Sequence, residues 1–171
     1  MEIKKEKACA FTGHTPEKLR QGQISDAQVD FWLNQKILEA VKDGYSIFIS
    51  GLARGTDIIA AEAVLRVRKT IPECKDIKLV IARPLENFGA SWTEDWKERR
   101  DIVVNEADEV VDIWTLYSRN QRTFHARDRW MVDHANRIIA MYLGIPGGTQ
   151  YTIGYAKRQG IEVIDYMEEV Y

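Results

Sequence analysis

The 171-residue sequence has little cysteine, almost no charge imbalance and no long apolar run. Its two cysteines, Cys9 in an expected strand and Cys74 in an expected polar turn, do not form the disulfide framework of a small secreted protein. A net charge of −2 argues against nucleic acid or anionic lipid as a partner. Because no apolar leader and no stretch of eighteen apolar residues are present, we expect a cytoplasmic protein without membrane association.

What the sequence does contain is apolar residues in short runs, amounting to 45% of the chain. This is enough for one domain with a core, over residues 1–171. We expect strands at 8–12, 45–49, 77–82, 109–114, 137–143 and 161–164. Continuous apolar strands indicate a sheet covered by helices on both faces. The prediction is therefore an α/β protein with a three-layer, Rossmann-like fold and a mostly parallel sheet.

Helix-like segments separate these strands. Capping boxes at Ser25 and Ser91 indicate two helix starts. The first of these helices should end at Gly44, and the second should bury Trp96 and Val103. The segment between the first strand and Ser25 reads as a polar loop. Further helices are expected at 55–69, 123–134 and 149–159.

Two glycine-bearing turns, 50–57 (SGLARGTD) and 144–149 (GIPGGT), connect an expected strand to an expected helix. Glycine lets a ligand approach the main chain, and the first helical turn presents unpaired N–H groups with a partial positive charge. The carboxyl ends of parallel strands share one edge of the sheet. Four residues that follow strands should therefore converge there: Gly13, Gly51, Arg83 and Gly147. The pattern predicts a nucleotide- or phosphate-type ligand at this edge.

Within this edge the second turn is the stronger phosphate candidate, because two glycines precede an N-capping threonine. The predicted ligand-binding residues are Gly13, His14, Ser50, Gly51, Arg54, Gly55, Asp57, Arg83, Gly147, Gly148 and Thr149. Several have structural alternatives. Asp57 in a first helical turn would stabilise the helix dipole by roughly 0.3–1 kcal/mol. Arg54 would be an ordinary surface residue, and His14 a hydrogen-bonded structural residue.

Motifs for a cofactor or a metal are absent, and one aromatic and basic segment has two interpretations. No P-loop lysine follows the glycines, and no G-x-G-x-x-G fingerprint occurs, so we predict no cofactor. His125 and His134 are not at metal-ligand spacing, and we predict no metal site. Segment 114–130 mixes aromatic rings with arginines, which suits stacking on a base or, equally, core packing with salt bridges to Asp128 and Asp133. The tryptophans leave homo-oligomerisation open.

Three blocks, 9–19, 49–57 and 147–156, together resemble the YpsA-like branch of the SLOG superfamily, including prophage-encoded members. The resemblance spans residues 8–165. It implies a Rossmann-like domain that binds or senses a nucleotide or a nucleotide-derived ligand such as an ADP-ribose-like molecule. Relatives of that branch include DprA/Smf proteins, which bind single-stranded DNA, and Lonely-guy enzymes, which hydrolyse nucleoside monophosphates.

The Lonely-guy pattern, Pro-Gly-Gly-x-Gly-Thr-x-x-Glu, is only partly present. Gln150 and Tyr151 stand in place of Gly-Thr, and Gly154 stands in place of the catalytic glutamate. Without that carboxylate, cleavage of an N-glycosidic bond loses its stabiliser or base. The resemblance therefore favours binding over hydrolysis, with a nucleotide N-glycosidase and DprA-like binding of single-stranded DNA as alternatives. The catalytic candidates for hydrolysis are His14, Asp57 and Glu62.

Overall fold

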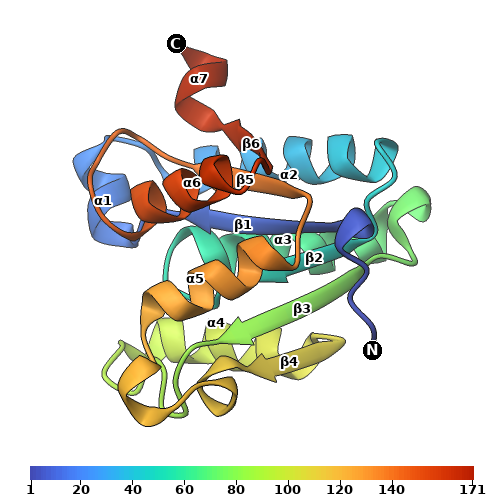
Figure 1. Cartoon of the computed structure of the whole chain (residues 1–171). Helices are drawn as coiled ribbons and strands as arrows, with labels where there is room; N and C mark the ends of the chain where they lie inside the picture. Colours follow the sequence, from blue (N-terminus) through green and yellow to red (C-terminus); the bar gives the residue numbers. More distant parts are fainter.

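A computed structural model describes residues 1–171 and contains one six-stranded sheet (Figure 1). Its strands are β1 (Ala8–Gly13), β2 (Ile47–Ser50), β3 (Lys78–Arg83), β4 (Glu109–Asp112), β5 (Arg137–Met141) and β6 (Glu162–Asp165). They lie in the order β4-β3-β2-β1-β5-β6, and every neighbouring pair is parallel. The predicted α/β, Rossmann-like fold is confirmed, with a sheet that is parallel throughout.

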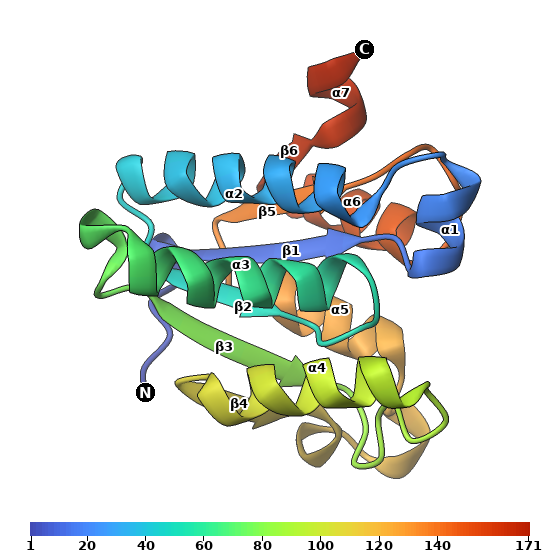
Figure 2. The ribbon, with the colours of Figure 1, turned by 180° about the vertical axis from the view of Figure 1, so that it is seen from behind.

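The helices form a layer on each face of this sheet. They are α1 (Pro16–Gln21), α2 (Asp26–Lys42), α3 (Thr56–Thr70), α4 (Glu94–Glu106), α5 (Phe124–Asp133), α6 (Gly148–Arg158) and α7 (Tyr166–Val170). Figure 2 shows α2, α3 and α4 on one face, whereas α5 and α6 cover the face seen in Figure 1. The chain moves outward from β1 to β4 and then restarts at β5 on the other side of β1. Because the strand order reverses between β1 and β5, the later crossovers run in the opposite direction, and right-handed crossovers then place their helices on the other face.

Each face of the sheet has its own apolar core. In β1, Cys9 and Phe11 pack toward α2 and α3, whereas Ala8 and Ala10 pack toward α5 and α6. Phe11 also stacks on Phe48 of β2 with ring centroids 6.0 Å apart. Successive strand residues point to opposite faces, so burial of both faces requires continuous apolar runs. This is why the strands could be predicted without an alternating pattern.

Two helices were not expected from the sequence. Helix α1 replaces the predicted polar loop: Pro16 begins it, and Leu19 is its buried apolar residue. Helix α7 begins after Asp165, whose side chain accepts a hydrogen bond from the N–H of Met167. Both helices are too short for a clear apolar period. No helix in the structure combines the length and apolarity that crossing a membrane requires.

Three local predictions are wrong. Ser91 does not cap a helix, because α4 starts at Glu94, and Trp92 instead packs edge-on against Phe88 with centroids 5.1 Å apart. Thr149 is not the N-cap of α6, because the helix starts at Gly148 and Gly147 is the residue before it. The strand predicted at 109–114 ends at Asp112, where the chain turns into a short 3-10 helix.

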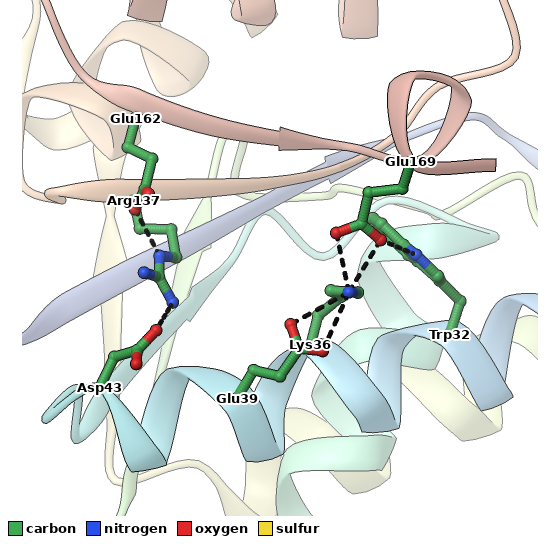
Figure 3. Close-up of polar contacts among 7 residues, drawn as sticks. All are labelled: Trp32, Lys36, Glu39, Asp43, Arg137, Glu162 and Glu169. Atoms are coloured by element: carbon green, nitrogen blue, oxygen red, sulfur yellow. Dashed lines mark hydrogen bonds and ion pairs between the residues drawn. The ribbon is translucent and has the colours of Figure 1, made fainter. Parts of the chain in front are cut away.

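The C-terminal helix α7 is tied to α2 by a charged cluster (Figure 3). Glu169 accepts hydrogen bonds from Lys36 Nζ at 2.8 Å and from Trp32 Nε1 at 3.0 Å. The Lys36 side chain is only 9% exposed and also pairs with Glu39. Burial alone would lower the pKa of Lys36, but the hydrogen bonds to Glu169 and Glu39 outweigh it and raise the pKa. The cluster therefore stabilises a buried ammonium group.

We expect Glu169→Gln to lower the free energy of unfolding by about 1 kcal/mol, because it removes a charged partner of a buried cation without changing its shape. For a chain of this size, the melting temperature should fall by roughly 2–4 °C. The neighbouring Glu168→Gln is the control, since Glu168 and its partner Lys157 are both exposed, 3.4 Å apart. Thermal unfolding followed by circular dichroism measures both variants. Equal losses of stability in the two would contradict this interpretation.

Candidate functional site

A cavity of about 470 Å³ lies at the carboxyl edge of the sheet, at the reversal between β1 and β5. Its walls come from the end of β1, from the turn after β2 and from the loop after β3. The first turns of α5 and α6 and the helix α1 complete it. The carboxyl edge of an open parallel sheet is the usual ligand site of such folds.

One wall of the cavity is the N-terminus of α6. Gly148 and Thr149 line it, and Gly147 precedes them without providing a side-chain cap. The first N–H groups of a helix have no intrahelical acceptor, so these donors are available to a ligand. The ammonium group of Lys18 donates to the carbonyl of Pro146 at 2.8 Å, and a Cβ on Gly147 would lie 2.1 Å from its Nζ. Glycine thus permits a cation beside a helix N-terminus, an arrangement suited to an anion.

The other glycine-bearing turn makes its hydrogen bonds within the protein. The N–H and hydroxyl of Thr56 both donate to the carbonyl of His14, at 3.2 and 3.1 Å. Gly55 has a φ of +85°, and a Cβ there would lie 2.7 Å from the same carbonyl. The Ser50 hydroxyl donates to the carbonyl of Asp57 at 2.7 Å. This turn therefore positions side chains at the cavity and offers few free main-chain donors.

His14 connects the two strands at which the strand order reverses. Its side chain is buried, and its Nε2 accepts a hydrogen bond from the N–H of Leu143 at 3.0 Å. Burial, assisted by the charge of Lys18, lowers the pKa of His14 to about 4. The ring is therefore neutral at neutral pH with its proton on Nδ1, and it binds no phosphate as a cation.

Asp57, Arg127 and Asp128 form a buried charged cluster in the cavity wall. The exposed fractions of these three residues are 7%, 6% and 9%, respectively. Arg127 Nε donates to Asp128 Oδ1 at 2.7 Å, and its guanidinium also donates to the carbonyl of Gly51. Asp57 Oδ2 accepts a hydrogen bond from the N–H of Ala53 at 3.3 Å. Burial raises the pKa of Asp57 to about 7 although the charge of Arg127 lowers it, so its proton exchanges near neutral pH.

An aromatic wall made of Phe88, Trp92 and Phe124 closes the far side of the cavity. The ring of Phe88 lies 5.1 Å from that of Trp92 and 5.8 Å from that of Phe124. Arg54 lies over Trp92, 6.0 Å from the ring centroid, and pairs with Glu17 at 2.9 Å. Such a wall suits a flat, partly apolar group such as a nucleobase.

The structure brings most of the predicted site residues together. Six line the cavity: Gly13, His14, Arg54, Asp57, Gly148 and Thr149. Four others support it from behind: Ser50, Gly51, Gly55 and Gly147. Arg83 does not line the cavity, because it pairs with Asp112 at 2.6 Å. Glu62 lies outside it as well, in a bidentate pair with Arg99.

Segment 114–130 contributes residues both to the protein core and to the cavity wall. Arg127 is buried with Asp128, and Arg129 donates to the hydroxyl of Tyr151 at 2.8 Å. Phe124 and His125 line the cavity, and Trp130 belongs to the core. No group of three or more His, Cys, Asp or Glu side chains is placed to share a metal ion.

Sequence reasoning missed three parts of the site. Lys18 lay in the segment predicted as a loop, although Pro16 is a helix-start signal that would have placed it on α1. Trp92 was assigned to a capping box. Asp128 was considered only as a salt-bridge partner, and no local signal places it beside Asp57.

Comparisons with known proteins agree with this architecture. The YpsA family model, described as the YspA SLOG family, matches residues 9–166. A UPF0398 protein of Bacillus cereus strain B4264 is 26% identical over 164 residues, which are 94% of this chain and 87% of that protein. The SPbeta prophage-derived protein YoqJ of Bacillus subtilis strain 168 is 29% identical over 141 residues, covering 74% of this chain and 81% of YoqJ.

A solved structure is similar as well. The X-ray structure of DNA processing protein A (DprA) from Streptococcus pneumoniae matches with a TM-score of 0.61 at 17% identity. The match covers 94% of this chain and 50% of that one, so the chain spans about half of DprA. At this identity the likeness concerns the fold alone.

Proposed function

The chain belongs to the YspA SLOG family, and from this premise we propose that its single domain binds a nucleotide or a nucleotide-derived, ADP-ribose-like ligand in the cavity. One observation carries the proposal. A helix N-terminus with an adjacent lysine and an aromatic wall face the same cavity. The first suits a phosphate and the second a base.

The strand order sets the distance between these two ends. Helix α6 follows β5, whereas Phe88 and Trp92 follow β3, three strand positions away. At about 4.8 Å per strand this is about 14 Å. We place the phosphate at Gly148, Thr149 and Lys18, the base at the aromatic wall, and the sugar between them.

A thermal-shift screen tests the proposal. Adenosine and guanosine mononucleotides, dinucleotides, ADP-ribose and the matching nucleosides are the probes. A ligand at 100 times its dissociation constant should stabilise the protein by about 2.7 kcal/mol, which raises the melting temperature by roughly 5–10 °C. Phosphate-bearing probes should exceed their nucleosides. The proposal fails when none of them shifts the melting temperature at millimolar concentration.

We expect Lys18→Met to weaken binding of a nucleotide about tenfold, because a charge-assisted contact to phosphate is lost. Binding of the matching nucleoside should not change. Arg20→Met is the matched control, since it removes the same charge from an exposed position on the same helix. Isothermal titration calorimetry gives both affinities. Equal losses in the two variants would assign the effect to general electrostatics instead of a phosphate contact.

Hydrolysis of the N-glycosidic bond is a second candidate function, and Asp57 is the observation that favours it. Its pKa of about 7 makes a buried carboxyl in the cavity able to give a proton to a leaving base near neutral pH. Glu62 takes no part in this candidate, since it pairs with Arg99 outside the cavity. Chromatography of nucleoside monophosphates after incubation would detect free base. Bound but intact nucleotides would leave binding or sensing as the function.

Binding of single-stranded DNA is the weakest of the functions considered. Arg127 and Arg129 of the basic segment already hold Asp128 and Tyr151. The net charge of −2 adds no broad attraction to phosphates. An oligonucleotide belongs in the same screen, and affinity that falls steeply with salt would revive this function.

A further inference from the structure

We propose, building on the proposed function, that the cavity selects ribonucleotides, with Asp57 and Asp128 each accepting one hydroxyl of the ribose cis-diol. Nothing in the family relationship specifies this selection. It follows from how the two buried carboxylates are held and from what each still lacks.

Each carboxylate has one oxygen that is engaged and one that is free. Asp57 Oδ2 accepts the N–H of Ala53 at 3.3 Å, and Asp128 Oδ1 accepts Arg127 Nε at 2.7 Å. The other oxygens, Asp57 Oδ1 and Asp128 Oδ2, accept no hydrogen bond from the protein. Neither oxygen is sealed from solvent, and both residues line the cavity. Both oxygens remain open to the cavity, so a ligand that brings two hydrogen-bond donors can reach them, and the hydrogen bonds to charged acceptors favour its binding.

The two carboxylates approach the ligand from opposite faces of the sheet. Asp57 is on α3 and Asp128 is on α5. They meet around Arg127: a Cβ built on Gly51 would lie 2.9 Å from both Arg127 Nη1 and Asp57 Oδ2. The residues Asp57 and Asp128 are 7% and 9% exposed, and Asp128 is hydrogen-bonded to this guanidinium, so the two acceptors have little freedom to move.

The charge of the cluster of Asp57, Arg127 and Asp128 determines which part of a nucleotide can bind next to it. One guanidinium faces two carboxyl groups, so the cluster offers no excess positive charge to a phosphate. Lys18, whose ammonium group donates to a main-chain carbonyl and not to a carboxylate, is at the other end of the cavity, beside α6. The middle of the cavity therefore takes the neutral, donor-bearing part of the ligand. In a nucleotide that spans from α6 to the aromatic wall, this part is the sugar.

The number of free oxygens distinguishes a diol from a base edge. Adjacent N–H groups on a base edge are best matched by both oxygens of one carboxylate, the bidentate geometry of planar pairs. Here each carboxylate offers one oxygen only. Two single acceptors match two hydroxyls on neighbouring carbons. A deoxyribose has only one of these two hydroxyls, so one of the two carboxylate oxygens would find no donor.

Calorimetric titration of the protein with four nucleotides tests the inference. The probes are adenosine 5′-monophosphate, its 2′-deoxy and 3′-deoxy forms, and its arabino form, which keeps both hydroxyls in a trans arrangement. Each altered sugar should bind about tenfold or more weakly, the cost of one unmade hydrogen bond to a charged group. Asp128→Asn should reduce this ratio to about threefold or less, whereas Asp133→Asn, on the same helix but bonded to Tyr155, should retain it.

The outcomes separate this inference from the proposed function. Equal affinity for all four nucleotides overturns ribose selection and leaves nucleotide binding intact. Failure of all four to bind at millimolar concentration, together with a negative thermal-shift screen, overturns both. Selection between the sugars can be read from the unmodified protein, so it is decided even when Asp128→Asn does not fold.

Discussion

Replacing Gly148 with glutamate is expected to abolish nucleotide binding, by about 100-fold or more, without unfolding the protein. Gly148 is the first residue of α6, and a Cβ there would meet no atom within 4 Å. The new carboxylate would take the phosphate position at the helix N-terminus and neutralise Lys18. Loss of charge-assisted hydrogen bonds together with repulsion between anions gives this size of effect.

The fold of the Gly148→Glu variant should be as stable as before, or more so. An acidic residue in the first helical turn adds about 0.3–1 kcal/mol, and exchange of a glycine also lowers the conformational entropy of the unfolded chain. Thermal unfolding with and without the nucleotide measures stability and binding together. Gly148→Gln is the uncharged control of equal size, and Gly148→Ala should bind normally. A full nucleotide-induced shift in the Gly148→Glu variant would falsify the phosphate assignment.

The sequence allowed the helix N-terminus at one end of the cavity to be predicted because its signals are local. Apolar runs, glycines and the start of a helix all lie within a few residues of one another at Gly147, Gly148 and Thr149. The rule that strand ends share an edge then joined this turn to His14 and Asp57. All of these except Gly147 line the cavity, and Gly147 lies directly beneath Lys18.

The rest of the site depends on contacts between distant parts of the chain. Asp128 lies 71 positions after Asp57 and meets it only because α5 returns on the other face of the sheet. Long-range pairing also removes residues from the site: Arg83 follows a strand as expected, but Asp112 on the neighbouring strand holds it. The position of a residue after a strand predicts that it lies at the carboxyl edge of the sheet. Whether its side chain is available to a ligand depends on a partner from a distant part of the chain, which the sequence does not indicate.

Asp57→Asn is expected to make the protein more stable at pH 8, by about 4 kcal/mol. In the unfolded chain Asp57 titrates near 3.8, whereas burial raises its pKa in the folded protein to about 7. Between these values the unfolded chain is ionised and the folded protein still holds the proton. Stability is therefore lost as the pH rises from about 4 to 7, and the difference between the two pKa values corresponds to about 4 kcal/mol.

Asparagine removes this loss because it cannot ionise. Its side-chain carbonyl still accepts the N–H of Ala53, and the attraction to Arg127 that is given up is already included in the net pKa of about 7. Urea unfolding of both proteins from pH 4 to 8 gives the two stability curves. Their difference isolates Asp57 from other titrating groups. His14, for example, has a lowered pKa and so loses stability in the opposite direction, as the pH falls.

The difference curve should be near zero at pH 4 and should rise to its full value above pH 7. A carboxyl group that lowers the stability of the folded protein at neutral pH does not contribute to holding the fold together. Destabilising side chains of this kind are common among residues that bind a ligand. Adding a nucleotide should then reverse the order of the two proteins, since only the aspartate can accept a charged hydrogen bond from the sugar. If the variant were instead less stable at pH 8, Asp57 would be an ionised partner of Arg127, and the structural explanation of this residue would be the correct one.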